Sequence, residues 1–255
     1  MGSILEVRGL SKRFGGLTAV AGLDFEVREG EILGMIGPNG AGKSTTFNLV
    51  AGAYPATSGE IFFKRESILG LPPHRIAARG ILRTFQHNRP FEGMSVIDNV
   101  LVGSHTRFRR GFFFLLSHDY FLEETQKRRR AEELIEFVGL AGLAQADVGT
   151  LSFGQGRLLE IARALAGEPR LILLDEPAAG LAPAELERLA AIIRGIAERG
   201  IAVLLIEHDM HFLLPLAHRV VVLNFGAKIA DGVPEEIRRD PAVMDAYLGL
   251  HAAAA

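Results

Sequence analysis

The most informative stretch of this sequence is Gly37-Pro38-Asn39-Gly40-Ala41-Gly42-Lys43-Ser44-Thr45. It fits the pattern G-x-x-x-x-G-K-[ST], in which glycines let the backbone wrap around a phosphate chain and present N–H groups to it. An apolar run at residues 31–36 precedes it and predicts a buried strand, and a helix is expected at residues 43–51. The start of that helix adds a positive dipole end that favours an anion. We therefore expect a nucleotide-phosphate site here, with Lys43 reaching the β- and γ-phosphates and Ser44 binding Mg²⁺.

A second apolar run, residues 171–174, ends in two carboxylates, Asp175 and Glu176. A parallel strand delivers its C-terminal end to the ligand crevice, beside the phosphate loop. Asp175 can hold Mg²⁺ there, usually through water, and Glu176 can accept a proton from the water that attacks the γ-phosphate, or orient that water. The alternative is a helix cap or a solvated acidic pair before Pro177. Together the two motifs indicate a P-loop nucleoside triphosphatase, but they do not distinguish among the families of that class.

The rest of the chain alternates strands with helices. Strands are predicted at residues 4–7, 23–27, 31–36, 59–63, 80–83, 171–174, 201–206 and 219–223. Helices are predicted at residues 43–51, 119–137, 154–165, 183–198 and 210–217. This alternation implies an α/β fold with a parallel sheet covered on both faces. The stretch from about Asn88 to Ala146 breaks the alternation, and we interpret it as a helical subdomain inserted into the sheet domain.

Composition excludes several classes of protein. The chain has 255 residues and no cysteine, which removes a disulfide framework, thiolate metal sites and cysteine nucleophiles. With a net charge of -2, the chain lacks the broad positive field of a general nucleic-acid-binding protein. No run approaches the ~20 apolar residues that span a bilayer. The most apolar run, residues 112–116, is either a core segment or a contact with a membrane partner, and the basic run at residues 127–130 is interpreted as a solvated helix face.

A third feature narrows the class: Leu151-Ser152-Phe153-Gly154-Gln155 precedes a predicted helix. The Ser152 hydroxyl and the bare Gly154 amide at a helix start form a second anion-binding device. With this feature the chain resembles the ATP-binding subunits of ABC transporters, whose signature is Leu-Ser-Gly-Gly-Gln. The resemblance implies that Ser152, Gly154 and Gln155 grip the γ-phosphate of the ATP bound to the opposite subunit. Phe153 stands where the family has its first glycine.

The resemblance assigns further roles. Gln86 matches the glutamine that touches Mg²⁺ and couples to membrane subunits, and His208 matches the switch histidine that contacts the γ-phosphate. Phe14 matches the aromatic residue that stacks on adenine, worth about 1–3 kcal/mol, and Val20 would pack on the other side of the base. The alternative for Gln86 is an exposed glutamine without a role, and for His208 a surface histidine. The alternative for Phe14 and Val20 is packing in the core. Ala182 stands where many members place an aspartate.

Four strings are similar to the branched-chain amino acid importer branch, the LivG-like type. They are residues 83–86, 176–181, 206–210 and 245–249. The resemblance implies an ATP-binding and ATP-hydrolysing importer subunit that uses Mg²⁺. It implies a RecA-like mixed sheet core with an antiparallel β subdomain over residues 1–87 and 152–250, a helical subdomain over residues 88–151, and a tail at residues 251–255.

The implied partners are a second ATPase subunit, a copy or a paralogue, in a head-to-tail dimer, together with two integral membrane permease subunits. An extracytoplasmic solute-binding protein would act indirectly, and no nucleic acid is expected. The chain would be cytoplasmic and peripheral on the inner face of the cell membrane. One alternative is a soluble ABC-type ATPase acting on nucleic acid or the ribosome, although these usually carry long coiled coils or tandem cassettes. The other is an unrelated P-loop kinase or GTPase, which would not need Ser152 or His208.

Overall fold

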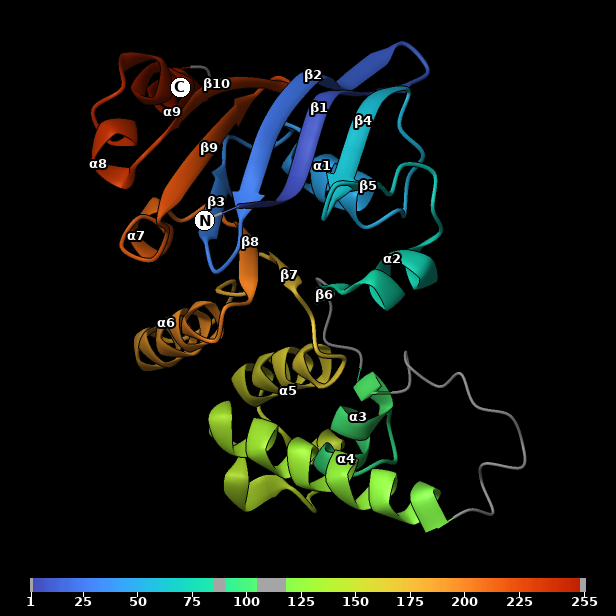
Figure 1. The fold of residues 1–255 in the computed structure, drawn as a ribbon. Helices are drawn as coiled ribbons and strands as arrows, with labels where there is room; N and C mark the ends of the chain where they lie inside the picture. The colour runs from blue at the N-terminus through green and yellow to red at the C-terminus, as the bar shows by residue number, and fades with distance from the viewer. Residues whose placement is uncertain (1, 85–89, 105–117, 253–255) are drawn as a thin grey trace.

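The computed structural model describes residues 2–84, 90–104 and 118–252. Two β-sheets and a lobe of helices make up the fold (Figure 1). The predicted site residue Gln86 and the apolar run at residues 112–116 lie outside the described residues.

The larger sheet has the strand order β10-β9-β3-β8-β7-β6. Its strands are β3 (Ile32–Ile36), β6 (Ile81–Arg83), β7 (Leu171–Asp175), β8 (Ala202–Ile206), β9 (Arg219–Asn224) and β10 (Ala227–Gly232). All neighbours are parallel except β10, which runs antiparallel to β9. The sheet is therefore mixed, as predicted, and the carboxyl ends of its parallel strands share one edge.

The smaller sheet is antiparallel, with the order β2-β1-β4-β5. Its strands are β1 (Ser3–Phe14), β2 (Leu17–Arg28), β4 (Ser58–Phe63) and β5 (Glu66–Ser67). The first two are much longer than the strands predicted at residues 4–7 and 23–27. Register shifts, as at β-bulges, interrupt their pairing beyond Val7 and Leu10, so the simple polar–apolar alternation does not run the length of the strand.

The helices are α1 (Lys43–Val50), α2 (Pro73–Arg79), α3 (Val96–Gly103), α4 (His118–Phe137), α5 (Phe153–Ala166), α6 (Pro183–Glu198), α7 (Met210–Leu213), α8 (Pro234–Ile237) and α9 (Pro241–Ala252), with 3₁₀ turns at Ala141–Leu143 and Val148–Thr150. Helix α7 ends earlier than predicted, at Leu213, and Pro215 follows its C-cap residue, Leu214. Proline has no N–H and cannot donate the next helical hydrogen bond. Strands β5 and β10 and helices α2, α8 and α9 do not appear among the predicted elements, and α9 runs past the predicted boundary at residue 250.

Each face of the larger sheet borders its own hydrophobic core. Leu33 and Met35 of β3 join a core with α1 and the smaller sheet, whereas Ile32 and Ile36 join a core with α5 and α6. The same alternation holds along β7, β8 and β9. Burial on both faces explains why these strands read as continuous apolar runs in the sequence.

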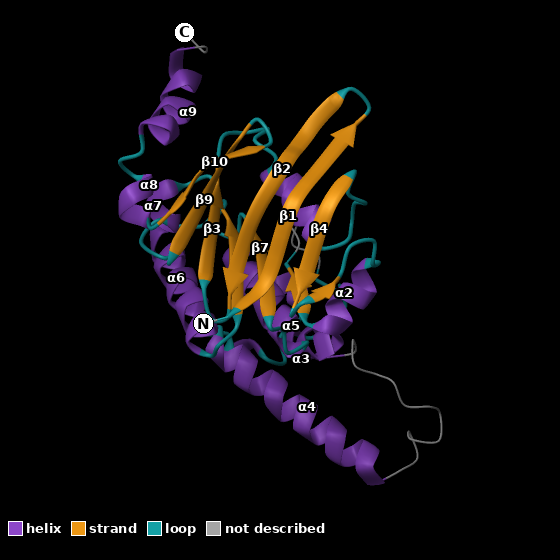
Figure 2. Ribbon diagram, turned by 45° about the horizontal axis from the view of Figure 1, so that its top comes forward, coloured by secondary structure: helices purple, strands orange, loops and turns teal. Residues whose placement is uncertain are grey.

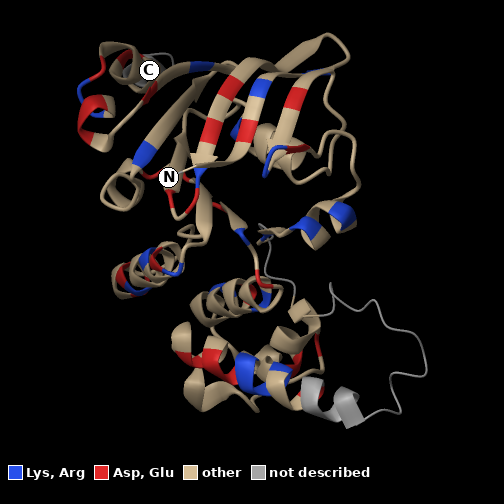
Figure 3. Ribbon diagram, in the orientation of Figure 1, with Lys and Arg blue, Asp and Glu red and all other residues tan. Residues whose placement is uncertain are grey.

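Helices α3, α4 and α5 pack together in a lobe below the sheets (Figure 1). A second view of the molecule shows that helix α4 extends away from the sheets (Figure 2). Its basic run, residues 127–130, is followed one turn later by acidic residues (Figure 3). Arg128 and Arg129 pair with Glu132 and Glu133, at 4.0 and 3.5 Å, which fits a solvated helix face. Among the residues described, no helix is both long enough and apolar enough to span a bilayer.

Candidate nucleotide site

The phosphate loop connects β3 to α1 with a backbone that excludes side chains at two glycines. Gly42, the N-cap of α1, has φ +100°, and a Cβ there would collide with the carbonyl oxygen of Ala19. At Gly37 a Cβ would collide with the carbonyl oxygen of Leu223. The two glycines of the sequence pattern are thus required by close backbone approach as well as by loop conformation.

Lys43 begins α1 and is buried across the loop. Its ammonium donates hydrogen bonds to the carbonyl oxygens of Gly37 at 2.7 Å and Pro38 at 3.0 Å. Burial lowers the pKa of Lys43, while the charges of Glu176 and Asp175 raise it. The fold therefore brings Lys43 into the electrostatic range of both predicted carboxylates.

Asp175 and Glu176 lie where β7 ends, at the same edge of the sheet as the loop. Asp175 is buried, and its Oδ1 has no hydrogen-bond partner among the described residues. Burial, and secondarily the charge of Glu176, raises the pKa of Asp175 to about 6, against the lowering effect of Arg83 and Lys43. An unpartnered buried carboxylate oxygen is a hard donor of the kind that Mg²⁺ prefers, so the residues present fit that ion.

Glu176 has a left-handed backbone, with φ +47°, and its N–H donates to the carbonyl of Ile206 at 2.9 Å. Nδ1 of His208, which follows β8, lies 3.8 Å from Oε2 of Glu176. Because β7 and β8 are neighbours in the sheet, their ends place these two predicted side chains side by side. A left-handed glutamate is a strained conformation of the kind that collects at functional sites.

The phosphate loop forms the floor of an open pocket of about 480 Å³. Its lining is Phe14, Leu17, Thr18, Ala19, Asn39, Gly40, Ala41, Gly42, Lys43, Ser44, Thr45, Glu176 and Phe225. Phe14 thus lines the pocket, and its stacking on adenine stays a prediction. Val20 does not line the pocket, because its side chain is 0% exposed in the core beneath the smaller sheet. The expectation that Val20 packs on a base is wrong, and core packing explains this residue.

Ser152, Gly154 and Gln155 lie at the start of α5 and do not line this pocket. The Ser152 hydroxyl accepts from the Gln155 N–H at 3.2 Å, and the Gln155 side chain accepts from the Ser152 N–H at 2.9 Å, which is a capping box. A Cβ at Gly154 would collide with the carboxylate of Glu185, which caps α6. The signature stretch is thus a capped helix start that lies outside the lining of the phosphate-loop pocket.

Glu207 is a site residue to which the sequence analysis gives no role. It is 0% exposed, and its Oε1 accepts from the N–H of Ala178 at 2.9 Å, while Oε2 has no partner among the described residues. This hydrogen bond joins the segment after Glu176 to the residue next to His208. A charged residue directly after an apolar strand was the only sequence signal. Burial raises the pKa of Glu207 to about 7 against the lowering effect of the Ala178 hydrogen bond.

We expect Glu207→Gln to abolish a pH dependence of stability. A carboxyl with a pKa of about 7 when folded, against an ordinary 4.5, stabilises the fold fully below pH 4.5 and loses that contribution as pH rises through 7. From pH 5 to pH 8, the free energy of unfolding of the wild type should fall by about 2–3 kcal/mol relative to the variant. Urea unfolding of both proteins at the two pH values measures this, and a parallel loss of stability in both would contradict it.

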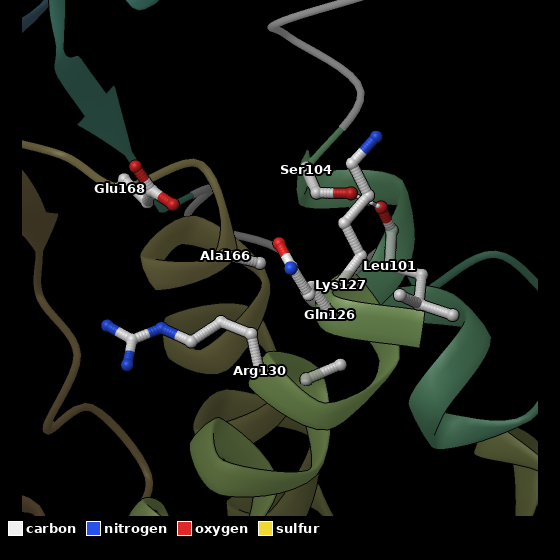
Figure 4. Close-up of a pocket in the computed structure, with 8 residues that line it drawn as sticks. Leu101, Ser104, Gln126, Lys127, Arg130, Ala166 and Glu168 are labelled. Carbon is white, nitrogen blue, oxygen red and sulfur yellow. Dashed lines mark hydrogen bonds between the residues drawn. The ribbon is translucent and has the colours of Figure 1, made fainter. Parts of the chain in front are cut away.

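A second pocket, of about 340 Å³, lies among α3, α4 and the end of α5 (Figure 4). Its lining is Leu101, Ser104, Gln126, Lys127, Arg130, Ala131, Ala166 and Glu168. None of these is a predicted site residue, so this pocket is distinct from the one at the phosphate loop.

A glycine-rich loop between a buried strand and a helix, with two carboxylates on the same sheet edge, defines a P-loop nucleoside triphosphatase. Residues 20–179 match the family model described as ABC transporter. Residues 227–253 match the model described as branched-chain amino acid ATP-binding cassette transporter. This chain belongs to the ABC transporter family and is an ABC-type ATPase.

Individual relatives agree with the family match. The chain is 46% identical to the high-affinity branched-chain amino acid transport ATP-binding protein BraF of Pseudomonas aeruginosa, covering 96% of this chain and 98% of that protein. It is 41% identical to LivG of Escherichia coli, with the same coverage. The ADP conformation of MJ1267, an ATP-binding cassette of an ABC transporter, superposes with a TM-score of 0.86 at 32% identity, over 98% of this chain and 100% of that one. The predicted family, branch and fold are confirmed, and the alternatives are not favoured.

Proposed function

We propose that this chain hydrolyses ATP to drive an importer of branched-chain amino acids. The observation that supports this most is the 46% identity to BraF, a branched-chain amino acid transport ATP-binding protein, over nearly the whole of both chains. The match of residues 227–253 to the branched-chain amino acid model adds a second, C-terminal piece of support.

In this proposal the loop amides and Lys43 bind the phosphates, and Glu176 takes a proton from the attacking water. His208, 3.8 Å from Glu176, would contact the γ-phosphate. Ser44 and Asp175, with Gln86 from outside the described residues, would hold Mg²⁺, which neutralises phosphate charge when bound. Phosphoryl transfer needs mainly positioning and charge stabilisation, which these residues supply.

We further propose that two ATPase subunits, identical or paralogous, meet head to tail. Ser152, Gly154 and Gln155, at the start of α5, do not line the phosphate-loop pocket of their own chain, so in this proposal they bind the nucleotide of the facing subunit. ATP would contact both subunits, whereas ADP would make far fewer contacts with the second subunit. The second subunit would therefore bind ATP more tightly than ADP, and this difference in affinity can close the dimer and reopen it after hydrolysis.

The helical segment at residues 88–151 would transmit this motion to two integral membrane permease subunits, and indirectly to an extracytoplasmic solute-binding protein. The chain would then be cytoplasmic and peripheral on the inner face of the membrane. This division of the chain into domains stays a prediction, since helix α5, which follows the boundary at residue 151, packs with α3 and α4.

Purification of the complex from membranes tests the proposed function. We expect two integral membrane proteins and a second ATPase subunit to co-purify. With its binding protein, a branched-chain amino acid should stimulate ATP hydrolysis by the complex, and a basic amino acid should not. A complex carrying Lys43→Ala is the control for hydrolysis by contaminants. Recovery with ribosomes or nucleic acid, and no membrane protein, would contradict the proposal.

We expect Asp175→Asn to remove the benefit of Mg²⁺ for nucleotide binding. An amide keeps the shape of the side chain but loses the anionic oxygen that a hard cation prefers. Calorimetry should show that MgATP binds about 10- to 100-fold more weakly to the variant, since a charge-assisted contact is worth about 1.5–3 kcal/mol. ATP in EDTA should not bind more weakly to the variant than to the wild type. Unchanged MgATP affinity would show that Asp175 is not a ligand.

A further inference from the structure

The turn between β9 and β10 holds a phenylalanine in an unfavourable conformation. Asn224 and Ala227 pair, and the two residues between them, Phe225 and Gly226, have φ values of +46° and +81°. Two successive positive φ angles define the pattern of a type I′ turn, which favours asparagine or aspartate, then glycine. A bulky residue in the left-handed region is strained. Phe225 offsets little of this strain by burial, since it is 86% exposed.

The turn is fixed against the phosphate loop. The N–H of Gly226 donates to the carbonyl of Ala41 at 3.0 Å, and the carbonyl of Gly226 accepts from the N–H of Ala21 at 2.8 Å. One residue thus joins the turn to the loop on one side and to β2 on the other. The location of Phe225 relative to the loop is therefore set by hydrogen bonds and not by its own side chain.

Phe225 lines the phosphate-loop pocket together with Phe14 and Leu17, which flank the turn between β1 and β2. Their exposed fractions are 86%, 43% and 68%. Exposed apolar side chains gathered at one pocket mark a place where a ligand covers them. Phe14 already packs on Tyr54 in a T-shaped pair, with ring centroids 5.6 Å apart, whereas Phe225 has no ring contact among the described residues.

We propose that Phe225 is a second aromatic contact for the base of the bound nucleotide, on the opposite turn from Phe14. This inference rests on the proposed function. The phosphates fix one end of the ligand at the loop, and the apolar rim offered by two turns suits its flat aromatic end. A base stacks on an aromatic side chain without needing hydrogen bonds, so a phenyl ring is sufficient.

The substitution Phe225→Asn separates this role from the role of the turn. Asparagine adopts positive φ readily, so the variant should unfold at the same temperature as the wild type or higher. We expect it to bind ATP about tenfold more weakly by calorimetry, within a range of about 5- to 100-fold for one stacking contact. Tripolyphosphate, which has no base, should bind equally to both proteins. Leu69→Asn, at an exposed apolar residue outside the pocket lining, should change neither affinity.

A second variant reports the contact directly. The chain has no tryptophan, so Phe225→Trp places one indole at the rim. Its emission should change when ATP or ADP is added and stay constant with tripolyphosphate.

The proposal is overturned if Phe225→Asn binds ATP as the wild type does, or if ATP leaves the emission of the Phe225→Trp indole unchanged. Equal weakening of ATP and tripolyphosphate would also overturn it, since the turn would then act on the loop through Gly226. If the wild type binds ATP and tripolyphosphate and Phe225→Asn binds both equally well, the proposal for Phe225 fails but the proposed function stands. A wild-type chain that binds neither ligand refutes the proposed function itself.

Discussion

Replacing Glu176 with glutamine is expected to lower ATP turnover by about 10²- to 10⁴-fold, the usual contribution of a general base. Glutamine has the size of glutamate, and the left-handed backbone at this position is unchanged by the swap, so ATP binding should persist. His208, whose Nδ1 lies 3.8 Å from Oε2 of Glu176, is unchanged in this variant. The ATP-bound dimer should then accumulate because its opening depends on hydrolysis.

Single-turnover hydrolysis and size-exclusion chromatography in ATP measure the two effects of Glu176→Gln. Glu187→Gln, on the exposed face of α6, is the matched control and should hydrolyse ATP as the wild type does. Wild-type turnover in Glu176→Gln would refute the assignment of the base.

Replacing Lys43 with alanine is expected to weaken ATP binding by about 100-fold. The ammonium is buried at the loop and donates charge-assisted hydrogen bonds, each worth about 1.5–3 kcal/mol when made to an anion. The loss should appear equally for ATP and for tripolyphosphate, because Lys43 belongs to the phosphate end of the pocket. This distinguishes it from Phe225, whose loss affects only a ligand with a base.

Calorimetric titration of both ligands measures the effect of Lys43→Ala, with Lys228→Ala as a control that removes an ammonium outside the pocket lining. Thermal unfolding in the absence of ligand checks that the variant folds. ATP affinity equal to that of the wild type would remove Lys43 from the site.

The central sheet and the phosphate loop could be predicted from the sequence because their signals are local. Four strands buried on both faces read as apolar runs, and the loop pattern follows one of them directly. The carboxylates Asp175 and Glu176 follow from the same logic, since the end of a parallel strand has one location in such a fold.

Other parts of the site depend on contacts between distant segments. Val20 was placed at the base by resemblance, but the pleat of β2 turns its side chain into the core. The turn at Phe225 could not be predicted from the local sequence, because phenylalanine stands at a position where a type I′ turn favours asparagine. The burial of Glu207 arises only when the segment containing Ala178 folds over it.

The claim on which the account depends most is that a second subunit completes each nucleotide site with its Ser152 loop. Its most direct test is ATP turnover per molecule over a dilution series, with light scattering reporting the fraction of dimer. We predict that turnover per molecule falls with that fraction, and approaches zero for the monomer. Full turnover per molecule in samples that contain only monomer would contradict the account.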